Sequence, residues 1–226
     1  MFSCSTMMHI PTSQFLKLSK FKPIPDPRCK TKVATLSMGC FWGPDSLFGS
    51  IKGIMRTKVG YTGGSEPDLP TYKSIGDYIE SIELYYDPSK ITYLDLLQVF
   101  WNNHDSTDKS SYRQYISAIH FHDKEQEQQA RDSMKKMEET KSNSIQTLLM
   151  PYKTFYDAEN YHQKYILRKY KIFLESLCLN DDEIKNTYAA CVLNGYLGGH
   201  ISETEKVRIL DIGLSDEQLR YLEACL

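Results

Sequence analysis

Hydrophobic and polar residues alternate along several short segments of the chain, and hydrophobic residues recur at helical spacing along others. Alternation predicts strands over residues 33–38, 56–61, 80–86 and 115–121, with a shorter strand over 145–149. A Thr92-x-x-Asp95 capping box precedes an apolar stripe that includes Phe100 and Trp101. The capping box and the stripe together predict a helix that starts after Thr92. Further helices are predicted over residues 44–48 and from residue 123 to about residue 141.

The chain reads as helical after about residue 170. Capping boxes at Ser202-x-x-Glu205 and Ser215-x-x-Gln218 predict two helix starts in this part. The glycine-rich stretch over residues 194–199 predicts a flexible hinge between the helical pieces. Helices and strands intermix without a regular βαβ rhythm, which indicates the α+β class.

Length and composition limit the function classes. The 226 residues are 41% hydrophobic and 25% charged, values that exclude a disordered or fibrous chain. The net charge of −2 creates no global attraction to nucleic acid or to a membrane surface. No apolar run approaches the roughly 18 residues that a membrane span requires.

Residues 1–31 differ in composition from the rest, because they are basic and contain Asp26 as their single acidic residue. We interpret this leader as a disordered tail of a cytoplasmic protein, with a mitochondrial presequence as the alternative. The domain organisation predicted from the sequence is therefore a leader over residues 1–31, a core domain over 32–170 and a helical C-terminal extension over 171–226.

The chain has six cysteines and no CxxC pair, which argues against a zinc ribbon or a thioredoxin-type site and favours a reducing compartment. Cys40 is the strongest candidate for chemistry. It lies where a predicted strand ends, just before a helix led by Pro44. Unpaired backbone N–H groups and the helix dipole stabilise a thiolate at such a position. A buried structural cysteine is the alternative interpretation.

The segment GCFWG over residues 39–43 resembles the signature of A-type peptide methionine sulfoxide reductases. Further blocks occur in the order of that family and cover roughly residues 32–170: GYTGG over 60–64, PTY over 70–72, Glu80 followed by YDP over 86–88, FWNNHD over 100–105, QYISAI over 114–119 and FYDAENYHQKY over 155–165. The chain is therefore similar to this family over most of its length. The fold expected from the resemblance is an α+β one, with a mixed or antiparallel sheet and flanking helices around a ferredoxin-like α/β plait, followed by the helical extension.

The resemblance implies reduction of the S epimer of methionine sulfoxide, free or in proteins, without a metal or another cofactor. Cys40 corresponds to the thiolate that attacks the sulfoxide sulfur. Glu80 corresponds to the acid that protonates the departing oxygen, provided that a poorly hydrated pocket raises its pKa. Tyr72 and Tyr115 match the tyrosines that hydrogen-bond the oxygen.

Phe41 and Trp42 match the aromatic residues that hold the methyl group of the substrate and distinguish the epimers by shape. After methionine departs, Cys40 is left as a sulfenic acid, the first reversible stage of thiol oxidation. Turnover then requires thiols, and the resemblance implies thioredoxin as the reductant.

The chain departs from the family in its Gly-rich tail, where many members place a resolving cysteine. Leu197 stands at that position, so the remaining candidates are Cys178, Cys191 and Cys225, each with packing in an apolar helix face as the alternative. The sequence does not choose among them.

A second departure concerns the rim of the site. The loop over residues 106–113 is shorter than in the family and lacks its GNDxG segment, and Tyr78 stands where the family commonly has a histidine. We therefore expect a conserved pocket core with an altered rim.

Two other functions remain open at this stage. Cys40 paired with His104 or His162 would make a cysteine hydrolase, although the second cysteine of papain-like motifs is missing. A non-catalytic methionine-sulfoxide-binding module is the other alternative. Both histidines are interpreted as structural and no metal site is expected, because neither has metal-ligand spacing.

Overall fold

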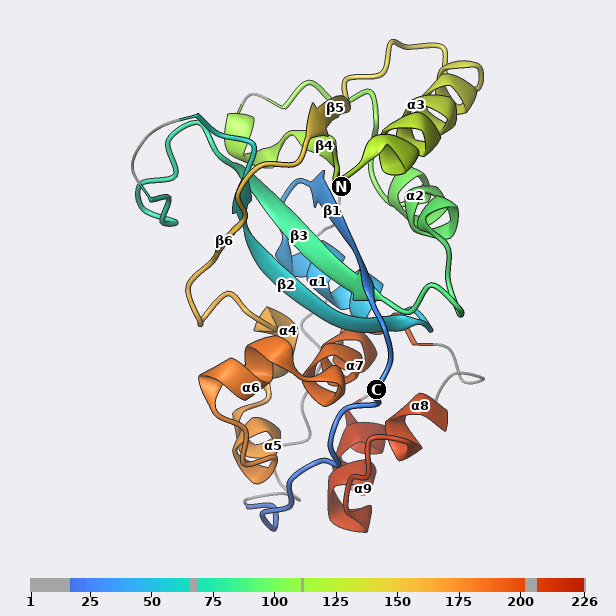
Figure 1. Ribbon diagram of the computed structural model, residues 1–226. Helices are drawn as coiled ribbons and strands as arrows, with labels where there is room; N and C mark the ends of the chain where they lie inside the picture. The colour runs from blue at the N-terminus through green and yellow to red at the C-terminus, as the bar shows by residue number, and fades with distance from the viewer. Residues whose placement is uncertain (1–16, 66–68, 111, 202–206, 226) are drawn as a thin grey trace.

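A computed structural model of the protein describes residues 17–65, 69–110, 112–201 and 207–225 (Figure 1). Its centre is a six-stranded sheet in the order β5-β4-β1-β3-β2-β6, antiparallel except for the parallel pair of β4 and β5. The strands are β1 (Lys32–Met38), β2 (Ile54–Thr62), β3 (Ile79–Tyr86), β4 (Ser117–Phe121), β5 (Leu148–Pro151) and β6 (Tyr156–Asp157). The mixed sheet confirms the predicted α+β class.

The first four strands and two of the helices form the expected plait. Strand order β4-β1-β3-β2 combined with helices after β1 and after β3 is the ferredoxin-like arrangement. The helices are α1 (Trp42–Gly49), α2 (Tyr93–Asn102) and α3 (Lys124–Glu138), and their apolar residues share one core cluster with the sheet. The Thr92 capping box forms as predicted at the start of α2.

The opposite face of the sheet is polar but buried. Ser37 of β1 and Ser81 of β3 hydrogen-bond each other at 2.7 Å, and Ser37 also contacts the His120 ring at 2.9 Å. The chain between β5 and β6 passes over this face, where Tyr152 stacks on His122. Polar side chains tolerate burial here because they bind one another.

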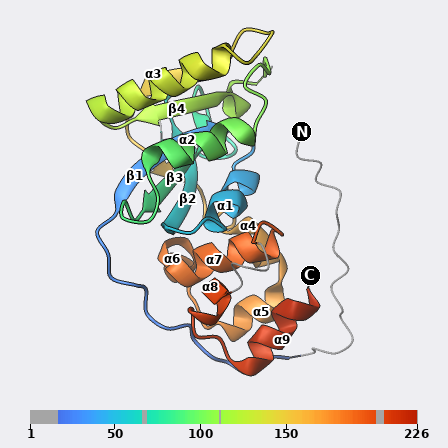
Figure 2. The ribbon, with the colours of Figure 1, turned by 90° about the vertical axis from the view of Figure 1, so that its right-hand side faces the viewer.

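The C-terminal helices gather in a second layer below the sheet (Figure 2). They are α4 (Tyr165–Lys169), α5 (Lys171–Ser176), α6 (Asp181–Asn186), α7 (Tyr188–Leu197), α8 (Val207–Leu210) and α9 (Asp216–Ala224). The Ser215 capping box starts α9 as predicted, whereas the Ser202 box lies outside the described residues.

The predicted hinge over residues 194–199 is wrong for its first four residues. Asn194–Leu197 form the last turn of α7 and are buried. A Cβ atom on Gly195 would lie 2.4 Å from the backbone nitrogen of Ser50, and one on Gly49 would lie 2.5 Å from the carbonyl oxygen of Cys191. These glycines therefore allow α1 and α7 to pack closely, which is a different use of the missing side chain from flexibility.

The leader was expected to be disordered, but its described part, residues 17–31, lies extended along the C-terminal helices. Leu18 is 4% exposed and belongs to their apolar cluster. The segment also hydrogen-bonds the helical layer: the Phe21 N–H donates to the Ser176 carbonyl, the Ile24 N–H donates to the Ile212 carbonyl, and the Asp26 carboxylate accepts from the Tyr188 N–H. Burial and backbone pairing thus order a segment whose composition predicts disorder.

Candidate active site

Cys40 lies exposed in the turn between β1 and α1. Gly39, just before it, has φ +77°, a left-handed conformation that favours glycine. Phe41 is the N-cap residue, and its backbone N–H points away from the helix to a carboxylate. The turn therefore presents the thiol at the start of α1, the end of a helix at which a thiolate is favoured.

Glu80, on β3, is 1% exposed and holds two hydrogen bonds. Its Oε2 accepts from the Phe41 N–H at 3.0 Å, and its Oε1 accepts from Gln114 Nε2 at 2.6 Å. Burial raises the pKa of this carboxyl group above its usual range, and the two hydrogen bonds oppose that shift without cancelling it. Glu80 is thus placed to hold a proton beside the residue that follows Cys40.

Two tyrosines, Tyr72 and Tyr115, lie near Glu80 and Cys40. Tyr115 ends the short helix η1 (Arg113–Tyr115), and its hydroxyl hydrogen-bonds Tyr72 from the loop after β2. Burial, that hydrogen bond and the negative charges of Glu80 and Cys40 all raise the pKa of Tyr115. The phenol therefore stays protonated over the neutral range and remains a hydrogen-bond donor.

The two aromatic residues that follow Cys40, Phe41 and Trp42, are positioned by contacts with His162 and Tyr165. Trp42 stacks on Tyr165 with ring centroids 3.7 Å apart, and its Nε1–H donates to His162 Nδ1 at 3.1 Å. The Phe41 ring is 1% exposed and meets the His162 ring edge-on at 5.1 Å. The sequence interpretation assigned His162 only a structural role, although its motif block could have indicated proximity to the site.

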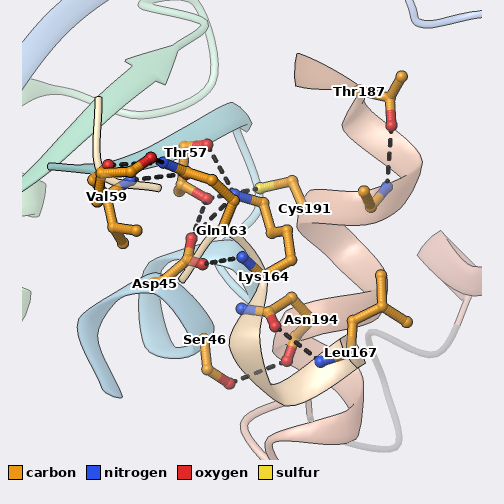
Figure 3. A network of polar contacts seen from close by, with 12 residues as sticks. Asp45, Ser46, Thr57, Val59, Gln163, Lys164, Leu167, Thr187, Cys191 and Asn194 are labelled. Carbon is orange, nitrogen blue, oxygen red and sulfur yellow. Dashed lines mark hydrogen bonds and ion pairs between the residues drawn. The ribbon is translucent and has the colours of Figure 1, made fainter. Parts of the chain in front are cut away.

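The two residues after His162, Gln163 and Lys164, bind β2, and Lys164 also binds the first turn of α1 (Figure 3). The Gln163 amide donates to the Val59 carbonyl and accepts from the Val59 N–H, like a strand neighbour. Lys164 Nζ, fully buried, donates to Asp45 Oδ1 at 3.1 Å and to the Thr57 carbonyl at 2.7 Å. Because Asp45 lies in the first turn of α1, this buried pair holds the helix start that carries the site.

The shortened loop is anchored to the rim by Arg113. Its Nε donates to the Asp77 carbonyl at 2.7 Å, and its Nη2 contacts the Gly63 carbonyl at 3.5 Å. Tyr78, at the position of the family histidine, is buried and packs edge-on against Tyr156. Arg113 thus ties the loop before β4 to the segments that contain Gly63 and Asp77.

The three candidate resolving cysteines differ in exposure. Cys191 is fully buried in α7, 3.7 Å from Thr57 Oγ1, and burial raises the pKa of its thiol. Cys225, after α9, is also buried, and burial raises its pKa as well. Cys178 is exposed in the turn after α5.

The His104 side chain is held by other groups and does not serve as the base of a hydrolase dyad with Cys40. His104 Nδ1 contacts the Phe100 carbonyl at 2.7 Å, and its Nε2 contacts Thr147 Oγ1 at 3.1 Å, so both ring nitrogens are engaged. Across the described ranges, no cluster of His, Cys, Asp and Glu could hold a metal ion. No helix in the same part of the chain is long and apolar enough to cross a membrane.

An exposed thiol at a helix start, beside a buried carboxyl group and paired phenols, defines the class as a thiol-dependent oxidoreductase on a ferredoxin-like plait. Comparison with known proteins agrees. The family model described as peptide methionine sulfoxide reductase matches residues 32–189. The chain belongs to the peptide methionine sulfoxide reductase family.

Individual relatives extend this result. The chain is 43% identical over 202 residues to the peptide methionine sulfoxide reductase of Drosophila melanogaster, covering 88% of this chain and 82% of the relative. It is 43% identical over 143 residues to MsrA of Methanococcoides burtonii, covering 58% and 93%. Among solved structures, reduced Mxr1 from Saccharomyces cerevisiae is similar with a TM-score of 0.59 at 30% identity, covering 68% of this chain and 93% of that one.

Proposed function

We propose that this enzyme reduces methionine-S-sulfoxide, in oxidised proteins and as the free amino acid, to methionine. The observation that carries the proposal is the contact between Glu80 and the N–H of Phe41, the residue after Cys40. It joins a buried carboxyl group, whose pKa is raised by burial, to the turn that presents the thiol. One hydrogen bond thus connects the proposed acid to the residue that follows the proposed nucleophile.

The proposed reaction uses these groups together. The Cys40 thiolate attacks the sulfoxide sulfur while Glu80 gives its proton to the sulfoxide oxygen. The hydroxyls of Tyr72 and Tyr115 donate hydrogen bonds to that oxygen as negative charge builds on it. The bond from Cys40 Sγ to the substrate sulfur forms as the S–O bond breaks and the protonated oxygen leaves as hydroxide. The hydroxide then attacks Sγ, the S–S bond breaks with its electron pair on the methionine sulfur, and methionine departs from the sulfenic acid of Cys40.

Phe41 and Trp42 bind the substrate methyl group in this proposal. Trp42 is half-buried and oriented by Tyr165 and His162, so one face of the indole is fixed before substrate arrives. A rigid apolar wall favours the epimer whose methyl group points to it.

The sulfenic acid is proposed to be reduced by thiols, with thioredoxin as the physiological reductant. Thioredoxin reduces disulfides, so a second cysteine of this chain would first condense with Cys40. Cys178 is the exposed candidate, and Cys191 and Cys225 are alternatives that require their helices to open.

A single-turnover assay tests the proposal. Reduced enzyme is mixed with each epimer of N-acetyl-methionine sulfoxide without added reductant, and methionine release is measured. We expect about one equivalent from the S epimer, little from the R epimer, and none from Cys40→Ser, whose circular dichroism should match the parent protein. Equal consumption of both epimers, or retained activity in the serine variant, would refute the assignment.

A further inference from the structure

Gln114 is the side chain through which the loop before β4 reaches the acid of the site. Its Nε2 donates to Glu80 Oε1 at 2.6 Å, while the Phe41 N–H holds the other carboxyl oxygen at 3.0 Å. Glu80 is 1% exposed, so these donors replace the solvation that water would otherwise give its anion. One donor comes from the turn of the thiol and the other from Gln114.

The backbone around Gln114 is fixed. Gln114 is the middle residue of η1, which closes with a hydrogen bond from the Tyr115 N–H to the Tyr112 carbonyl. Arg113, one residue earlier, is tied to the carbonyl of Asp77 at 2.7 Å. The short loop therefore delivers the amide to Glu80 from a restrained position.

We propose that Gln114 is a positioning residue for the reduction, whose amide N–H fixes the plane of the Glu80 carboxyl group and stabilises the carboxylate left when its proton moves to the sulfoxide oxygen. This inference rests on the proposed function of Glu80. Phe41 supplies a backbone donor that every substitution except proline keeps, so the side-chain donor of Gln114 is the one that mutation can remove cleanly.

The other titratable groups around Glu80 do not obscure its titration. Tyr61 faces it from β2, where the two residues are paired in register, and Tyr115 faces it from η1. The pKa values of both phenols are raised by burial. Cys40 and Glu80 both act on Tyr115 through their charge. His162 packs against Phe41 and Tyr72, and burial lowers its pKa, which favours the neutral ring.

Removing the Gln114 donor changes the pKa of Glu80 in a predictable direction. The hydrogen bond favours the ionised form of Glu80, so its loss raises the pKa of Glu80 further and makes it a weaker acid. The first turnover needs a Cys40 thiolate and a protonated Glu80. The descending limb of its pH profile, which reports ionisation of Glu80, therefore moves to higher pH while the plateau rate falls.

The test is the pH dependence of the single-turnover rate for Gln114→Met, which keeps the length and removes the donor. We expect the descending limb to move up by about one pH unit and the plateau to fall about 10-fold. Gln128→Met makes the same change on the exposed surface of α3 and should leave both unchanged. Thermal unfolding of both variants checks that they fold.

Glu80→Gln and the double variant separate this inference from the proposed function. If Glu80→Gln leaves the first turnover intact, the acid assignment itself fails. If Glu80→Gln slows it but Gln114→Met keeps the parent pH profile, the role of Gln114 is overturned. A positioning role predicts that Gln114→Met lowers the single-turnover rate far less in the Glu80→Gln background than it does alone. Should Gln114→Met unfold, Gln114→Leu, which also removes the donor, replaces it with the same expected shift.

Discussion

Glu80 shows at the scale of one residue how burial creates chemistry. An exposed glutamate is ionised at neutral pH and cannot act as an acid. The 1% exposure of Glu80 raises its pKa, and its two hydrogen bonds keep that rise limited. The raised pKa favours the protonated form that an acid needs, and the hydrogen bonds stabilise the anion that remains after the proton moves to substrate.

Replacing Glu80 with Gln should lower the single-turnover rate about 10²-fold or more, because the proton source is lost while hydrogen bonding remains. The sign of the pH effect follows from the raised pKa. Parent activity should fall as the pH rises through the pKa of Glu80, and the variant should lack that descending limb. Stopped-flow methionine release between pH 5 and 9 measures both. A rate within about threefold of the parent would remove Glu80 from this role.

Helix α1 shows at the scale of an element how a site is held by its neighbours. The helix is short, eight residues, and has no side-chain N-cap hydrogen bond, so it depends on tertiary contacts. Lys164 and Asp45 secure its first turn from one side, and α7 packs on its last turn at Gly49 and Gly195. The position of Cys40 therefore depends on residues from the C-terminal layer.

Gly195→Ala tests this dependence. The added methyl group would lie 2.4 Å from the Ser50 nitrogen, so α1 and α7 must separate. We expect a loss of about 1–3 kcal/mol in the free energy of unfolding, which is typical of overpacking. Urea denaturation at equilibrium measures it. An unchanged midpoint would show that the two helices adjust without cost.

The whole molecule consists of a plait, a helical layer below it and an N-terminal segment that joins them. Residues 17–31 leave β1 and run along the C-terminal helices, where Leu18 enters their apolar cluster. The candidate resolving cysteines belong to this second layer. The proposed recycling of Cys40 by one of these cysteines therefore involves both layers.

Cys178→Ser should lower thioredoxin-driven steady-state turnover at least several-fold, because Cys178 is the exposed candidate and burial raises the pKa of both other thiols. The first turnover and the activity with dithiothreitol should persist, since small thiols attack the sulfenic acid directly. Cys29→Ser, at another exposed cysteine, is the matched control. Normal thioredoxin-driven turnover in Cys178→Ser would assign resolution to another thiol.

The sequence alone determined the family resemblance, the strands of the plait and the turn that carries Cys40. These features depend on local order: alternation sets which face of a strand is buried, and a motif keeps its residues adjacent whatever surrounds them. The same reasoning identified Glu80 and Tyr115, because their motif blocks are short and contiguous.

Only the tertiary structure decided the role of the glycines, the order of the leader and the partner of Glu80. Gly195 serves helix packing because Ser50 happens to face it, and composition cannot show what lies opposite a glycine. Residues 17–31 are ordered by helices more than 140 positions away in the chain. Gln114 meets Glu80 across 34 residues. Such contacts arise from the packing of distant segments, whose geometry no local pattern contains.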